Sequence, residues 1–281
     1  MMANLAAVIA ASLSLAQQTD TTFAVGANPR LELKNYSGDV VVTTWDRNEV
    51  RIVAEHGSRD RPEIERDGSE ISVRMHSRWG VPAIADFDIT VPRNTDLEIS
   101  GVGVAARIMD IAGDVSIESV EGGIELVGGE GVISLSSVEG DISVEDASGK
   151  IAITAVDGDI SVRGSEGSLT TQTVDGEIIL EGIDSDDVEA STVDGDITYQ
   201  GSITDGGRYT LSTHDGDLSV TIPEGANARV SVATFSGELD TDFPVEIEGD
   251  IGRKRFSFTL GTGKAVLELS AFDGTIGLRR P

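Results

Sequence analysis

Cysteine is absent from this chain, which excludes disulfide bonds, thiolate metal sites and lipidation at a cysteine. Aromatic residues are scarce, at 4% of the sequence, whereas apolar residues as a whole reach 39%. That apolar content is enough for a core. Because the core is poor in Phe, Tyr and Trp but rich in Val, Ile and Leu, we expect thin, regular layers of small side chains instead of one globular centre.

Basic residues are few relative to acidic ones. The chain has 21 Lys and Arg against 49 Asp and Glu, which gives a formal net charge of −28. The phosphates of nucleic acids and the surface of an anionic membrane would repel such a chain. We therefore expect no nucleic-acid partner, and cations or basic partners fit better.

Long apolar runs are missing except at the N-terminus. Residues 1–16, MMANLAAVIAASLSLA, carry no charged side chain and end in Ser14-Leu15-Ala16, where small residues suit a signal-peptidase site. We interpret residues 1–16 as a secretory signal peptide, with a retained anchor or a buried first strand as the alternatives. No other run approaches the ~20 apolar residues of a membrane helix. The mature chain is thus expected to lack a membrane span and to be exported to the periplasm, the cell surface or the extracellular space.

Glycine recurs at a spacing of nine, at residues 113, 122, 131, 140, 149, 158, 167 and 176. The surrounding unit is Φ-x-G-x-Φ-x-Φ-x-x, where Φ is apolar. Units that start at Val120, Val138, Val156 and Val174 carry acidic residues beside the glycine, whereas the intervening units mostly do not. The period is therefore eighteen residues, built of two halves of nine.

An Asp-Gly pair between alternating apolar runs ordinarily signals a β-hairpin. A two-residue hairpin at Gly158 would pair Val156 with Asp159 and place Ile160 on the opposite face. The pattern keeps Val156, Ile160 and Val162 together, so we expect a bend between short strands that all point Val and Ile inward. Coils of eighteen residues stacked in parallel ~4.8 Å apart predict an all-β fold, a single-chain parallel β-solenoid (β-helix). Right-handed winding is expected from the crossover preference, although a left-handed coil stays open.

The chain divides into four predicted parts: a signal peptide (1–16), an N-terminal β cap with the first strands (17–100), the regular solenoid repeats (101–241) and a C-terminal β cap (242–281). In the N-terminal cap, strands are expected on both sides of turns at Asp46-Arg47-Asn48 and Asp67-Gly68. Near the C-terminus, AFDGTIGL (271–278) restates the repeat. Caps are needed because open solenoid ends would expose unpaired strand edges.

Several segments together resemble a known family. They are, in order, YSGDVVVTTW, VPRNTDLEIS, the serial T-V-D-G-D-I units, VTIPEGANARV and AFDGTIGL. This order is similar to that of the adhesin-like β-strand-repeat proteins of bacterial envelopes, a family catalogued as a domain of unknown function. The family's turn residue is commonly Ser, as at Ser236, whereas Asp or Glu usually replaces it here. The resemblance implies an exported β-solenoid with envelope or surface association, and it implies no catalytic residues.

The carboxylates that flank the repeated glycines have two open interpretations. They can be turn residues whose charge keeps a large β surface soluble. They can instead form a ladder that binds divalent cations, as in the nonapeptide calcium β-roll. We favour the first interpretation and expect no cofactor, with calcium as the alternative. The candidate metal ligands of the second are Glu139, Asp141, Asp157, Asp159, Asp175, Glu177, Asp194 and Asp196, followed by Asp215 and Asp217.

An enzymatic function is not favoured by the sequence. Glycan-cleaving β-helices use one carboxylate pair in a groove, whereas the pairs here recur on coil after coil. The histidines His56, His76 and His214 are scattered, and His214 takes the position that Val156 and Val174 fill, so we expect it to be a packing or edge substitution. We therefore predict an exported, non-enzymatic β-solenoid that presents an acidic surface to an unidentified envelope or surface protein or glycan. The alternatives are a calcium-dependent binding module and a polysaccharide-processing β-helix enzyme.

Overall fold

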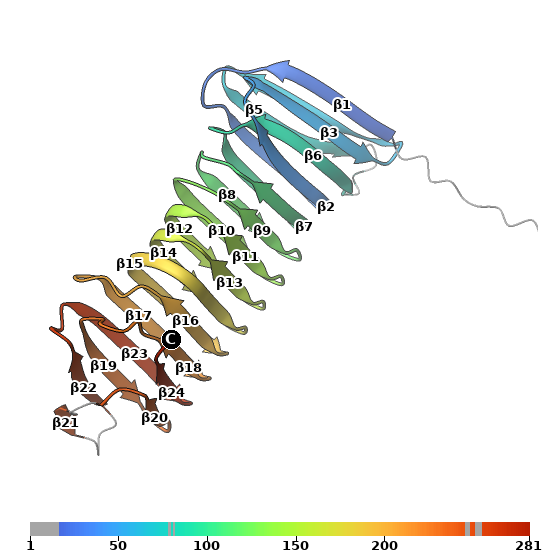
Figure 1. Cartoon of the computed structure of the whole chain (residues 1–281). Helices are drawn as coiled ribbons and strands as arrows, with labels where there is room; N and C mark the ends of the chain where they lie inside the picture. The colour runs from blue at the N-terminus through green and yellow to red at the C-terminus, as the bar shows by residue number, and fades with distance from the viewer. Residues whose placement is uncertain (1–16, 78–79, 81, 245–247, 251–254) are drawn as a thin grey trace, which may run out of the picture.

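The protein is an all-β stack of strands. The computed structural model describes residues 17–77, 80, 82–244, 248–250 and 255–281, so the predicted signal peptide lies outside the described residues. Within the described residues, pairing connects 24 strands, most of them parallel to their neighbours, into one large sheet. Figure 1 shows the strand pairs following one another as a long, slanted stack. In the described part of the chain, no helix has the length and apolar character required to cross a bilayer.

The central coils each contribute two strands, one to each side of the stack. Each strand pairs in parallel with its equivalent eighteen residues further on, as Ile133 does with Ile151 and Ile142 with Ile160. The predicted period of eighteen is therefore confirmed. The first strands of these coils are β8 (Val115–Ser119), β10 (Val132–Ser137), β12 (Ser148–Thr154) and β14 (Glu166–Gln172). The second strands are β9 (Ile124–Val127), β11 (Ile142–Glu145) and β13 (Ile160–Arg163), and the long β15 (Ile178–Asp194) belongs to both sides.

The core is a thin layer between these two sides of the stack. In the central coils, alternate strand residues point inward, so the same position of successive coils forms a buried column, such as Ile142, Ile160 and Ile178. Each fully buried side chain of this size contributes about 1.5–3 kcal/mol relative to an exposed one. The aliphatic columns explain how a chain with so few aromatic residues forms a continuous core.

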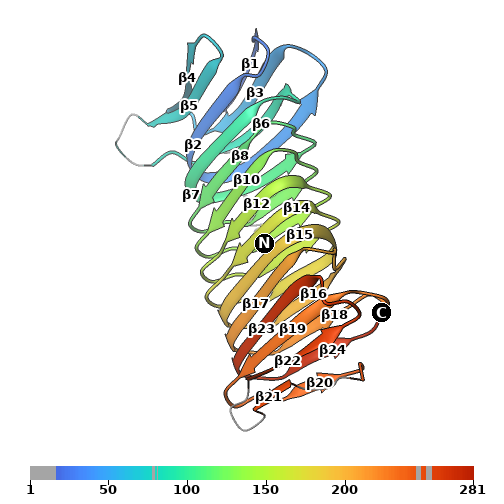
Figure 2. The ribbon, with the colours of Figure 1, turned by 90° about the vertical axis from the view of Figure 1, so that its left-hand side faces the viewer.

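The first coil of the stack lies well before the expected solenoid segment. The long β2 (Arg30–Trp45) pairs in parallel with β7 (Asp96–Met109), which pairs with β8 and β9. Around β2, the chain adds β1 (Gln17–Ala24), β3 (Glu49–His56), β4 (Asp60–Asp67), β5 (Glu70–Ser77) and β6 (Ala85–Pro92). The hairpin predicted at Asp67-Gly68 is confirmed, since β4 and β5 pair antiparallel and project from the stack (Figure 2). The strands beside Asp46-Arg47-Asn48 do not pair with each other, because β6 lies between β2 and β3.

At the C-terminal end, the coils are not stacked in the order in which they occur in the sequence. Its strands are β16 (Ile197–Gly201), β17 (Arg208–Asp215), β18 (Leu218–Thr221), β19 (Ala228–Thr234), β20 (Leu239–Thr241), β21 (Glu248–Asp250), β22 (Arg255–Leu260), β23 (Ala265–Asp273) and β24 (Ile276–Arg279). The coil of β23 and β24 lies between the coil of β17 and β18 and that of β19 and β20. The segment AFDGTIGL therefore does form a repeat, but inside the stack and not beyond it. Antiparallel pairing of β22 with β19 covers the free edge of that strand instead.

Two buried tyrosines occupy the place where the coils grow longer. Around the segment GIDSDDVEAST, the offset between paired residues rises from eighteen to nineteen for Ile178 with Ile197 and to twenty-one for Val188 with Tyr209. The rings of Tyr199 and Tyr209 lie edge to face with centroids 6.0 Å apart. Their hydroxyls donate to the backbone oxygens of Ser202 (2.8 Å) and Ser185 (2.7 Å). Burial raises the pKa of the Tyr199 hydroxyl, which further favours the protonated form that donates this hydrogen bond.

Candidate functional site

The carboxylates singled out in the sequence lie on one edge of the stack, where the chain passes from the first to the second strand of each coil. We call this edge the turn edge. At the corner formed by residues 155–160, Ala155 and Ile160 are buried, whereas Val156, Asp157 and Asp159 are exposed around a partly exposed Gly158. Successive coils repeat this arrangement. The structure therefore brings the predicted site residues into columns that run along the stack.

The residues before the glycines form a first ladder of exposed carboxylates. Parallel bridges place Glu139, Asp157, Asp175 and Asp194 in register, and strand pairing extends the column to Asp215 and Asp273. Among the ion pairs of the described residues, none involves a carboxylate of this ladder. Like charges ~4.8 Å apart repel by about 1 kcal/mol even in a water-like dielectric. The first ladder thus keeps its negative charge available to solvent.

The residues after the glycines form a second ladder with a different role. The backbone N–H of Asp159 donates to Oδ1 of Asp141 (3.0 Å), and the N–H of Glu177 donates to Oδ1 of Asp159 (2.8 Å). The same bond joins Asp217 N–H to Asp196 Oδ1 (2.7 Å). These aspartates therefore connect one coil to the next, which neither interpretation of the sequence anticipated. The second ladder consists of Asp141, Asp159, Glu177, Asp196 and Asp217.

This difference between the ladders predicts unequal effects for neighbouring substitutions. Asp159→Ser replaces the carboxylate that accepts from the Glu177 N–H with a shorter, neutral hydroxyl, and it is expected to lower the free energy of unfolding by about 1 kcal/mol. Asp157→Ser removes only a repelling charge, so stability is expected to stay unchanged or to rise slightly. Urea denaturation of the two variants measures both values. Equal changes in the two variants would contradict the role assigned to the second ladder.

The valine that precedes the first ladder points outward, so the expectation that Val156 and its equivalents face the core is wrong. Val156 is 42% exposed and Val174 is 48% exposed. The inward position belongs instead to the residue before the valine, which is Ser, Thr or Ala. In one coil, Thr173 Oγ1 donates to the backbone oxygen of Gly158 (3.3 Å). Because this small side chain fills the corner from inside, the valine must turn to solvent.

The outward valines and the residues in the equivalent position of the other coils form an apolar stripe beside the first ladder. At one end, His214 stacks on Phe272 with ring centroids 4.5 Å apart, and Phe272 stacks on Phe235 at 4.7 Å. His214 occupies the valine position of its coil, since Thr192 pairs with Thr213 and Asp194 pairs with Asp215 on either side of it. In order along the stack, the stripe consists of Tyr36, Val102, Val120, Val138, Val156, Val174, Val193, His214, Phe272 and Phe235.

The candidate metal ligands form columns, not a cage. Within the described residues, no group of three or more His, Asp or Glu side chains is arranged to hold a metal ion. Asp141 and Asp159 lie at the border of an open groove of about 830 Å³, which Arg107 and Arg163 also line. The hydroxyl of Ser161, in the same groove, is buried and has no hydrogen-bond partner among the described residues. Such a groove can accept a polar ligand.

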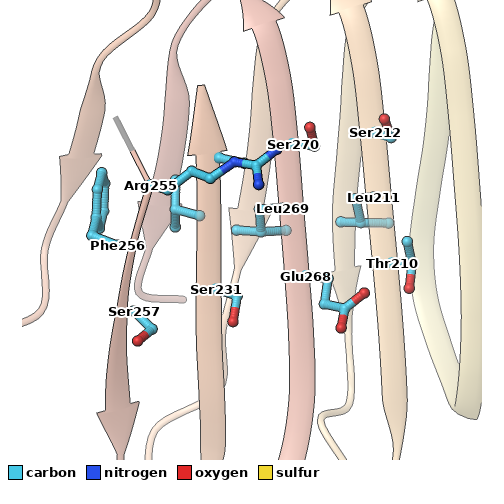
Figure 3. A pocket seen from close by; sticks show the side chains of 12 residues that line it. Thr210, Leu211, Ser212, Ser231, Arg255, Phe256, Ser257, Glu268, Leu269 and Ser270 are labelled. Atoms are coloured by element: carbon cyan, nitrogen blue, oxygen red, sulfur yellow. The ribbon is translucent and has the colours of Figure 1, made fainter. Parts of the chain in front are cut away.

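A second groove, of about 580 Å³, crosses the strands at the C-terminal end of the stack (Figure 3). Its lining combines the hydroxyls of Thr210, Ser212 and Ser270 with the charged side chains of Arg255 and Glu268. Figure 3 shows Arg255 extending from β22 across β19 toward β23. Among the described residues, Glu268 is the only acidic side chain that lines this groove.

The fold and the site define a class of protein, an all-β stack of mostly parallel strands with an edge of repeated carboxylates. Within that class, the family profile described as Toastrack DUF4097 matches residues 28–279, and the chain belongs to this family. The resemblance to a family of unknown function is thereby confirmed. One similar solved structure is a candidate cell adhesion protein from Clostridium sporogenes, with 8% identity, 95% of this chain and 100% of that chain covered, and a TM-score of 0.26. No curated protein matches the chain significantly.

Proposed function

We propose that the chain is an exported, non-enzymatic parallel β-solenoid whose turn edge presents an acidic surface to a protein or glycan of the cell envelope or cell surface, in the manner of an adhesin. The observation that carries this proposal is the first ladder, with carboxylates in register from Glu139 to Asp273. These carboxylates repel one another and form no ion pair within the described residues. Local features that reduce stability without a compensating contact are typical of functional sites.

The repetition of the site supports a binding function over a catalytic one. A catalytic carboxylate pair needs one special environment, in which the two groups differ in protonation. Along the turn edge, the same side chains recur on successive coils in the same backbone setting. Repeated, rigidly spaced contacts of equal kind suit recognition of an extended partner.

The direct experiment is an affinity capture from native cell envelopes with the mature chain as bait. The wild-type chain is expected to retain a specific protein or glycan that increasing salt releases, because exposed charges are screened. The edge variant Asp157→Asn/Asp175→Asn/Asp194→Asn is expected to lose it. The control variant Glu63→Gln/Glu166→Gln/Glu189→Gln removes the same number of exposed charges elsewhere and is expected to keep the partner. Retention by the edge variant would contradict the proposal.

Calcium binding is the alternative use of the ladders, and cation comparison tests it. We expect calcium and magnesium at matched ionic strength to raise the melting temperature alike, since both only screen the repulsion. A specific calcium site would add ~2.7 kcal/mol at a concentration 100 times its dissociation constant. A calcium-only increase that is lost in Asp157→Asn/Asp159→Asn/Asp175→Asn would replace the proposed function with a calcium-dependent binding module.

Export predicts a defined mature N-terminus. Cleavage after Ala16 would leave Gln17, the first residue of β1, as the N-terminus. Intact-mass measurement of the protein from the periplasm or the culture medium is expected to give the mass of residues 17–281. A mass that includes Met1 would show that the signal peptide has been assigned wrongly.

A further inference from the structure

We propose that the apolar stripe and the first ladder together bind an extended, basic segment of a partner protein in which apolar residues alternate with Lys or Arg. This inference rests on the proposed function and specifies its partner. A purely acidic binding surface does not explain the apolar stripe. Here the apolar stripe forms the second half of the binding surface.

The apolar stripe is an exposed surface along most of its length, with Val102 half-buried near one end. Single exposed apolar residues are common on proteins and need no explanation. Here the valines at positions 138, 156, 174 and 193 are each between 39% and 49% exposed and lie in register on neighbouring coils. At the ends, Tyr36 is 46% exposed and Phe235 is 65% exposed. Contiguous apolar surface of this kind marks an interaction site.

Charge is distributed unequally on the two sides of the apolar stripe. On one side, the residue that follows each stripe residue from Val138 to Phe272 belongs to the first ladder. Near the ends of the apolar stripe, Tyr36, Val102 and Phe235 are followed by uncharged residues. On the other side, five of the outward residues that precede the turn edge are neutral, namely Ser136, Thr154, Gln172, Ser191 and Ser212, whereas Glu118 is acidic. An occupant that covers the apolar stripe therefore meets most of the negative charge along the flank of the first ladder, and it is expected to carry its positive charge on that flank.

The charge also selects among the possible occupants. A second copy of this chain would bring two carboxylate ladders together, and the net charge of −28 would oppose the contact. Nucleic acids and anionic membranes are repelled for the same reason. A basic protein segment is attracted, and its apolar side chains remove the valines from water.

The geometry favours an extended segment. Ten rungs spaced ~4.8 Å apart make the apolar stripe about 40 Å long, which an extended chain covers with about 12 residues. Successive side chains of an extended chain point to opposite sides. A strand that lies along the boundary between the apolar stripe and the first ladder therefore directs one set of side chains over the valines and the other set over the carboxylates.

Defined peptides test this inference with the mature chain. The probe is a capped peptide of about 12 residues that alternates Leu and Lys, matched to the length of the stripe. Anisotropy titration is expected to detect binding of this peptide and much weaker binding of peptides that alternate Ser with Lys or Leu with Glu. Val138→Ser/Val156→Ser/Val174→Ser is expected to weaken Leu-Lys binding by roughly tenfold or more. Val132→Ser, which removes a valine that is 49% exposed outside the apolar stripe, is expected to leave it unchanged.

Two results would overturn the inference. They are equal binding of the Ser-Lys and Leu-Lys peptides, or equal affinity of the Leu-Lys peptide for the wild-type chain and for Val138→Ser/Val156→Ser/Val174→Ser, which we call the stripe variant. Melting curves establish that the variant is folded, and the near-isosteric Val156→Thr replaces it if the triple variant melts early. Envelope capture separates this inference from the proposed function. A native partner that the stripe variant keeps and the edge variant loses would refute the role of the apolar stripe but not the proposed function. A partner kept by both variants would refute the proposed function.

Discussion

Replacing Ile160 with aspartate is expected to lower the free energy of unfolding by about 3–5 kcal/mol. Ile160 is fully buried and lies in a column between Ile142 and Ile178. A carboxylate there has no basic partner, since its neighbours above and below are isoleucines. The cost is that of an unpaired charge in an apolar layer, and chemical denaturation followed by circular dichroism measures it.

Val156→Asp is the matched control, because it makes a comparable change four residues earlier in the same coil. Val156 is 42% exposed, so its replacement removes little buried surface and adds one more exposed charge to the turn edge. We expect a loss of about 1 kcal/mol or less from repulsion by the first ladder. Comparable losses for the two variants would mean that the corner has been assigned wrongly, with Val156 inside the stack.

Gly158→Ala is expected to lower the free energy of unfolding by about 2–3 kcal/mol, through overpacking of the backbone at the turn edge. A Cβ atom on Gly158 would lie 2.6 Å from the backbone oxygen of Gly140 on the neighbouring coil. The same contact recurs along the column, where a Cβ on Gly176 would lie 2.3 Å from the oxygen of Gly158. Backbone atoms cannot move away without separating the coils.

Gly26→Ala is the control for the steric overlap that an added Cβ causes at Gly158. Gly26 has no atom within 4 Å of an added Cβ, and it does not adopt a positive φ. Gly158 likewise is not among the glycines with positive φ, so the two variants differ in steric contact and not in backbone strain. Thermal unfolding is expected to show a lower melting temperature for Gly158→Ala and almost none of this loss for Gly26→Ala. A Gly158→Ala variant as stable as the wild type would contradict the close stacking of coils.

The repeat made the architecture predictable. A glycine every nine residues, with acidic residues at every second one, fixes an eighteen-residue coil, and the pairing of Ile142 with Ile160 has this offset. The close approach of Gly158 to Gly140 explains why the glycine recurs. Both signals are local and periodic, so one sequence is enough to read them.

The direction of the edge residues was harder to predict, because the corner breaks the alternation of the strands. Ile151, Ile153 and Ala155 point inward, and Ile160 is the next inward residue. Counting backward in twos from Ile160 puts Val156 inside, whereas counting forward from Ile151 puts Ala155 inside. The small Ser, Thr or Ala before each valine was the signal that could have decided between the two counts.

Two further features depend on contacts that no periodicity specifies. The hydrogen bond from the Glu177 N–H to Asp159 joins residues on different coils, so the separate roles of the two ladders emerge only when the coils are stacked. The insertion of β23 and β24 between earlier coils depends on which strand edge is free when the chain returns. A repeat sequence fits several such positions equally well.

Site-specific photocrosslinking tests most directly whether the turn edge is the surface that meets the partner. A photoreactive amino acid replaces Val156 on the turn edge in one variant and Val132, outside the apolar stripe, in another, since both valines are exposed. In native envelopes, we predict a discrete crosslinked product from position 156 and none from position 132. An excess of the Leu-Lys peptide is expected to prevent the crosslink at position 156. Crosslinking from position 132 without crosslinking from position 156 would contradict the claim.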